Sequence, residues 1–153
     1  MEFQEVVDSL IVELINEEKP DLIFFTGDLV NNHAKEAEPF VDTLKQLKSK
    51  YGKFAVLGNH DYADYIGLDL NSEDGRSKWQ RNFDEIKSHF ANSDFKLLLN
   101  ETKMLSLDGL EINVVGVENW GDGRFSKYGD LEKAMLSAKE GIPTFLLSHD
   151  PTH

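Results

Sequence analysis

The sequence contains no cysteine, which excludes a disulfide scaffold and any thiolate nucleophile or thiolate metal ligand. No apolar run approaches the ~20 residues that a membrane span needs, and no signal-peptide pattern opens the chain. Basic residues are scarce: 16 Lys and Arg face 28 Asp and Glu, for a formal net charge of −12. This balance argues against nonspecific nucleic-acid binding and against contact with an anionic membrane. A phosphorylated substrate remains compatible, because bound metal ions invert the local field.

The length and the hydrophobic pattern predict one α/β domain over residues 1–153. Apolar residues at helical spacing predict a helix over residues 3–18, and the apolar run at 22–26 predicts a buried strand. A second helix over 34–48 and a second strand over 54–57 complete a strand–helix–strand unit. The two strands of such a unit are expected to lie parallel, adjacent or nearly so.

The second half of the chain continues with shorter elements. Residues 62–77 are polar and are expected to form a long loop, followed by a helix over 77–90. Strands are predicted at 97–99, 104–107 and 110–117, with Asp108-Gly109 as a hairpin turn because both positions favour positive φ. Asp130 is expected to cap a helix that runs to Lys139, and the last strand is predicted at 144–147.

Polar residues follow three of the buried strands at the same structural point. They are Gly27-Asp28, Gly58-Asn59-His60-Asp61 and Ser148-His149-Asp150. If the three strands are parallel, these residues meet at one edge of the sheet, where α/β folds bind ligands. Carboxylate, amide and imidazole groups suit Mn, Fe, Zn or Mg. Each motif alone is more simply a polar turn, so the argument depends on their combination.

The motifs resemble those of the calcineurin-like metallophosphoesterases, including bacterial phosphohydrolases of that family. Gly27-Asp28-Leu29-Val30-Asn31 and Gly58-Asn59-His60-Asp61 match its second and third signatures, and Leu147-Ser148-His149-Asp150-Pro151 resembles the fourth. The resemblance implies a fold of βαβ sheets flanked by helices, and a centre of two divalent ions that hydrolyses phosphomonoesters or phosphodiesters.

The resemblance also implies roles for individual residues. Asp28 would bridge the two ions, and Asn59 and His149 would bind the second. His60 would act on the phosphoryl group, with Asn31 orienting it by hydrogen bonding. Asp61 is a third candidate for the catalytic group, and a supporting role and a simple loop cap both remain open for it.

Two family motifs are absent from the sequence, the opening Asp-x-His and the closing Gly-His-x-His. We therefore expect a partial domain, incomplete at both ends, whose parent protein hydrolyses phosphoesters while this piece is impaired or inactive. The alternative is a non-catalytic interaction module on the same fold. A sheet that lacks its first strand is also expected to self-associate through the exposed edge.

Overall fold

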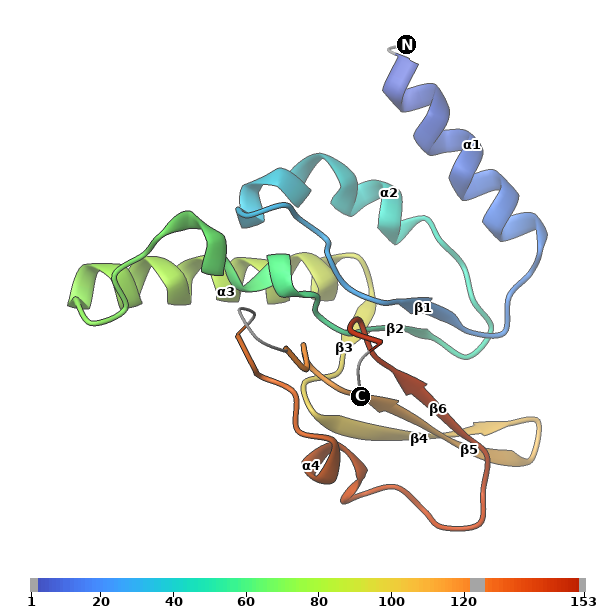
Figure 1. Cartoon of the computed structure of the whole chain (residues 1–153). Helices are drawn as coiled ribbons and strands as arrows, with labels where there is room; N and C mark the ends of the chain where they lie inside the picture. The colour runs from blue at the N-terminus through green and yellow to red at the C-terminus, as the bar shows by residue number, and fades with distance from the viewer. Residues whose placement is uncertain (1–2, 122–125, 152–153) are drawn as a thin grey trace.

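The computed structural model describes residues 3–121 and 126–151, and of residues 3–6 only the backbone. It contains two three-stranded sheets, in the orders β1-β2-β3 and β4-β5-β6 (Figure 1). The strands are β1 (Ile23–Phe25), β2 (Lys53–Ala55), β3 (Phe95–Leu97), β4 (Glu101–Leu107), β5 (Leu110–Gly116) and β6 (Thr144–Leu147). The α-helices are α1 (Phe3–Glu17), α2 (Val41–Lys45), α3 (Glu73–Asn92) and α4 (Leu131–Met135). Short 3₁₀ helices are η1 (Ala34–Phe40), η2 (Asn59–Tyr62) and η3 (Asp64–Ile66). The predicted α/β class is confirmed.

Alternating side chains of β2 and the residues after it show how the layers stack. Ala55 and Leu57 pack toward the helices, in one core with Ile86 and Phe90 of α3. Residues of opposite parity point to the other face of the strand, as the pleat requires. Phe54 and Val56 accordingly pack against residues of the second sheet, among them Ile112 and Val114. A smaller core beneath α4 completes a helix–sheet–sheet–helix arrangement.

The predicted strand–helix–strand unit is confirmed in its topology. β1 pairs with β2 in parallel, with Phe24 opposite Phe54, and β2 pairs in parallel with β3. The predicted hairpin is also present, because Asp108 and Gly109 adopt φ values of 48° and 92° between antiparallel β4 and β5. β6 pairs in parallel with β5, so the last strand belongs to the second sheet. The three motif-bearing strands therefore do not share one sheet edge.

Three helix boundaries differ from the prediction. The helix expected over 34–48 is a 3₁₀ helix followed by the short α2, and Pro39 lies inside the 3₁₀ part, where it cannot donate a backbone hydrogen bond. α3 begins at Glu73 rather than at 77, because the Ser72 side chain accepts from the Gly75 N–H as an N-cap. Asp130 caps α4 as predicted, through the Lys133 N–H, but the helix ends at Met135. Among the described helices, none is long and apolar enough to cross a membrane.

Candidate functional site

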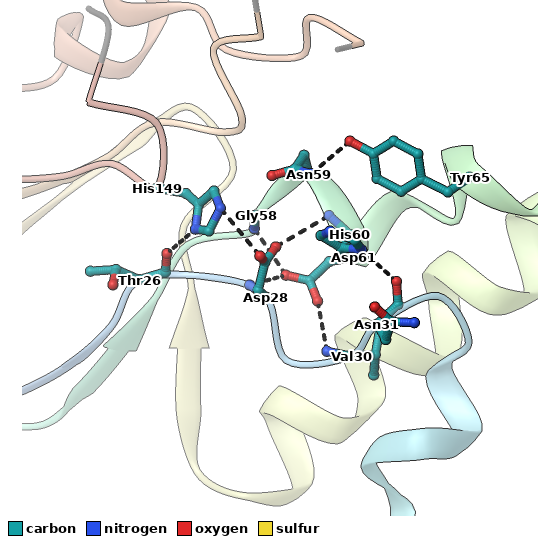
Figure 2. Close-up of polar contacts among 10 residues, drawn as sticks. All are labelled: Thr26, Asp28, Val30, Asn31, Gly58, Asn59, His60, Asp61, Tyr65 and His149. Carbon is teal, nitrogen blue, oxygen red and sulfur yellow. Dashed lines mark hydrogen bonds and ion pairs between the residues drawn. The ribbon is translucent and has the colours of Figure 1, made fainter. Parts of the chain in front are cut away.

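The polar residues that follow β1, β2 and β6 meet beyond the carboxyl ends of these strands (Figure 2). Two glycines permit this close approach. A Cβ on Gly27, which has φ +97°, would lie 2.4 Å from the Gly58 nitrogen. A Cβ on Gly58 would lie 2.1 Å from Asp28 Oδ1. The loops after β1 and β2 therefore touch through positions that only glycine fits, and the Asp28 carboxylate occupies the contact.

Asp28 and His149 form the centre of this cluster. Asp28 has φ 57°, a conformation that Asp tolerates better than most residues, and its side chain is 36% exposed. His149 Nε2 lies 3.4 Å from Asp28 Oδ2. The other ring nitrogen, Nδ1, is 2.7 Å from the backbone carbonyl of Thr26, which accepts its hydrogen bond. This contact fixes the ring with Nε2 turned toward the carboxylate.

His60 is also held by a main-chain carbonyl of the segment that follows β1. Its Nδ1 lies 2.6 Å from the backbone carbonyl of Asn31, and its backbone N–H donates to Asp28 Oδ1 at 3.2 Å. The sequence predicts that Asn31 orients His60, and in the structure the main-chain carbonyl of Asn31 makes this hydrogen bond with His60. The carbonyls on either side of Asp28, at Thr26 and Asn31, thus orient the two imidazoles (Figure 2).

Asp61 lies behind the cluster and is fully buried. Its Oδ2 accepts from the backbone N–H groups of Asp28 and Gly58, both at 2.9 Å, and its Oδ1 accepts from Val30 at 3.2 Å. Burial raises the pKa of Asp61 to about 6, with help from the Asp28 charge and against the N–H donors. The carboxylate joins the loop after β1 to the loop after β2.

Asn59 occupies the first position of η2, beside a pocket of about 210 Å³. The pocket is also lined by His149 and Asn119. The side-chain amide nitrogen of Asn59 donates to the Tyr65 hydroxyl at 2.6 Å. Because the two ends of an amide point apart, the oxygen faces away from Tyr65 (Figure 2).

A second and larger pocket, of about 400 Å³, lies beside the Asp28 loop. Its lining includes Asp28, Asn31, Phe40 and His60. Asp28 and His60 therefore border a space of the size that a small ligand needs.

The chain matches the calcineurin-like phosphoesterase family over residues 2–153. It belongs to that family. It is 31% identical over 142 residues to an uncharacterized metallophosphoesterase of Helicobacter pylori. This alignment covers 92% of this chain and 33% of the relative. It is 30% identical over 164 residues to the UDP-2,3-diacylglucosamine pyrophosphatase LpxG of Chlamydia trachomatis, covering 86% of this chain and 48% of the relative. The chain spans about a third to a half of the length of these relatives.

Calcineurin-like phosphoesterases generally use two divalent metal ions. The distances and donor atoms of the cluster can be compared with those that one such ion requires. Two ligands at about 2.1 Å from a tetrahedral ion are about 3.4 Å apart, which matches the Asp28–His149 separation of 3.4 Å. The hydrogen bond from His149 Nδ1 to a carbonyl is the usual support of a metal-bound histidine. Within residues 3–121 and 126–151, no group of three or more His, Asp and Glu side chains is placed to bind a metal. Asn59, the amide ligand expected from the sequence, lines the same pocket as His149.

The structure thus brings together all six residues selected from the sequence: Asp28, Asn31, Asn59, His60, Asp61 and His149. Sequence reasoning missed two contributors, the Thr26 carbonyl and Tyr65. A main-chain carbonyl leaves no signal in residue identity. Tyr65 lies in the stretch predicted as a long loop, and its position six residues after Asn59 is not part of the motif.

Proposed function

We propose that the parent protein of this chain hydrolyses phosphomonoesters or phosphodiesters at a dinuclear metal centre to which the described cluster belongs. The observation that carries the proposal is the Asp28–His149 pair, in which a carboxylate oxygen and an imidazole nitrogen lie 3.4 Å apart in fixed orientation. Family membership supports phosphoester chemistry in general terms. The name of the LpxG relative, a pyrophosphatase, supports the same class of substrate.

In this proposal Asp28, Asn59 and His149 hold a divalent ion, which is Mn, Fe, Zn or Mg. A bound ion of this kind polarises a phosphoryl oxygen and lowers the pKa of a water molecule. The donors are hard or borderline ligands, as these metals prefer. Asn59 adds an oxygen without adding charge, so the site keeps room for an anionic phosphate.

His60 is proposed to contact the phosphoryl group rather than a metal. Its Nδ1 is engaged by the Asn31 carbonyl, and the ring borders the 400 Å³ pocket beside Asp28. From there His60 can stabilise phosphoryl charge or protonate the leaving oxygen. Asp61 is proposed to act through Asp28 and Gly58, whose backbone N–H groups it binds, because it has no exposed surface for a substrate.

Titration of the chain with Mn²⁺ by calorimetry tests the metal site. We expect one weak site, of micromolar affinity or weaker, because the described residues supply three ligands. Asp28→Asn should remove the binding, whereas Asp108→Asn, the same change in the exposed β4–β5 turn, should not. Mn²⁺ binding that is unchanged in Asp28→Asn would refute the assignment.

Hydrolysis of a chromogenic phosphodiester in excess Mn²⁺ tests the reaction. The assay belongs on the parent protein, with the 153-residue chain measured beside it, and we expect activity in the parent that Asp28→Asn abolishes. A parent that binds Mn²⁺ but hydrolyses neither phosphomonoesters nor phosphodiesters would favour the non-catalytic interaction module.

A further inference from the structure

Tyr65 lies over the candidate site although it follows the motif by several residues. η2 ends at Ala63, which has φ 58°, and η3 ends at Gly67, which has φ 68°. These two left-handed residues fold the chain back, so that Tyr65 contacts both Asn59 and His60. Tyr65 is 44% exposed, so it lies at the surface rather than in the hydrophobic core.

An asparagine ligand has an orientation problem that a carboxylate does not have. One end of its amide is an oxygen, which can bind a cation, and the other is an NH₂ group, which can only donate hydrogen bonds. Rotation of the side chain by half a turn exchanges the two ends with little change in shape. A metal site that uses Asn59 therefore needs a partner for the NH₂ end.

The Tyr65 hydroxyl is that partner. It accepts a hydrogen bond from the Asn59 amide nitrogen at 2.6 Å, and the amide oxygen faces the opposite side (Figure 2). Asn59 and His149 line the same pocket, of about 210 Å³. Partners of this kind commonly change metal affinity nearly as much as the ligands they hold.

We propose that Tyr65 is a positioning residue that fixes the amide of Asn59 with its oxygen available to a divalent cation. The inference rests on the proposed function, since it takes Asn59 as a metal ligand. It assigns Tyr65 no contact with the substrate and no part in proton transfer.

The test uses Tyr65→Phe, because the ring of Tyr65 also packs on His60, with centroids 4.8 Å apart. Phenylalanine keeps that contact and removes only the hydroxyl. We expect the Mn²⁺ affinity of the chain, measured by calorimetry, to fall about 10-fold. Tyr51→Phe is the matched control, because it deletes the hydroxyl of a tyrosine that precedes β2, at the opposite end of this strand. It should leave the affinity unchanged.

A second background separates orientation from general structural support. In Asn59→Asp both ends of the side chain are oxygens, so nothing remains for Tyr65 to orient. We expect Tyr65→Phe to change Mn²⁺ affinity by less than about 2-fold in this background. An equal loss in both backgrounds would show that Tyr65 acts through loop structure, and no loss in either would also overturn the proposal.

Asp28→Asn keeps this failure distinct from failure of the site itself. If Asp28→Asn abolishes Mn²⁺ binding while Tyr65→Phe has no effect, the metal site stands and the role of Tyr65 is wrong. If Asp28→Asn leaves binding intact, the metal site is wrong, and the inference on Tyr65 is overturned with it.

Discussion

Replacing Gly58 with alanine is the sharpest available perturbation of the Asp28 carboxylate. Gly58 has φ −94° and ψ 176°, values that alanine adopts without strain, so the substitution acts through space alone. The added Cβ would lie 2.1 Å from Asp28 Oδ1, 2.7 Å from the Asp28 nitrogen and 2.9 Å from Asp28 Cγ. Ordinary contact begins at 3.4 Å, so Oδ1 must move by roughly 1 Å or more.

Such a displacement removes the contacts that define the site. Asp28 Oδ1 would lose the His60 N–H at 3.2 Å, and Oδ2 would leave its place 3.4 Å from His149 Nε2. Overpacking of this kind costs about 1–3 kcal/mol of folding stability. If Asp28 is a ligand, we expect Mn²⁺ affinity to fall about 10–100-fold, which is about 1.4–2.7 kcal/mol of binding free energy.

Gly75→Ala is a matched control for this experiment. A Cβ at Gly75 would lie 2.1 Å from the Asp69 carbonyl oxygen, the same overlap, in the first turn of α3. Thermal unfolding and Mn²⁺ calorimetry on both variants separate stability from binding. Both should lose stability, less so for Gly75→Ala because alanine favours a helix by up to about 1 kcal/mol. A folded Gly58→Ala variant with unchanged Mn²⁺ affinity would refute the role of Asp28.

Three further outcomes are expected. His60→Ala in the parent protein should lower kcat on a chromogenic phosphodiester about 10²–10⁴-fold while the bound Mn²⁺ is unchanged. If kcat is retained, His60 has a structural role, and if Mn²⁺ is lost, His60 is a metal ligand. Asn31→Ala should change kcat less than about 2-fold, because the His60 contact uses a backbone carbonyl, and a loss as large as that of His60→Ala would contradict this. The chain should self-associate in sedimentation at high micromolar concentration, through the edge strands β1 and β6, where Phe145 is 47% exposed. Phe145→Lys should weaken this association, whereas the control Leu136→Lys, at a more exposed residue after α4, should not. A chain that sediments only as a monomer would contradict the predicted self-association.

Hydrophobic patterning was sufficient to predict the order of elements because it reports which side chains are buried. The run around Phe54 and Val56 is apolar on both faces since one face meets helices and the other meets the second sheet. The same property concealed the partition into two sheets. A strand buried on both sides looks alike whether its cover is a helix or another sheet, so the place of β6 beside β5 could not be deduced.

The predicted helix boundaries were wrong where local hydrogen bonds determine the ends of a helix. Ser72 is followed by Glu73 and Asp74, an N-cap with an acidic first turn, and this signal was available in the sequence. It lay in a polar stretch without apolar periodicity, which the prediction treated as loop. Pro39 was likewise visible inside the region that forms a 3₁₀ helix.

The candidate site was predictable in its side chains and not in its supports. Motif spacing selected the residues that converge, but the groups that orient them are main-chain atoms, such as the Thr26 carbonyl. Tyr65 is a side chain, yet its contact with Asn59 depends on the left-handed turn at Ala63, which is an unusual conformation for alanine. No pattern of residue types indicates that turn.

One consequence of main-chain orientation concerns what the cluster can bind. The Thr26 carbonyl engages Nδ1 of His149, so the ring presents Nε2 to the Asp28 carboxylate at 3.4 Å. Two electron-rich atoms at this distance repel unless a positive charge lies between them, either a proton or a metal ion. The Asp61 carboxylate adds further negative charge behind the Asp28 loop. In the proposed function a divalent cation supplies that charge between Asp28 and His149, and it would attract the phosphate of a substrate to an otherwise acidic protein.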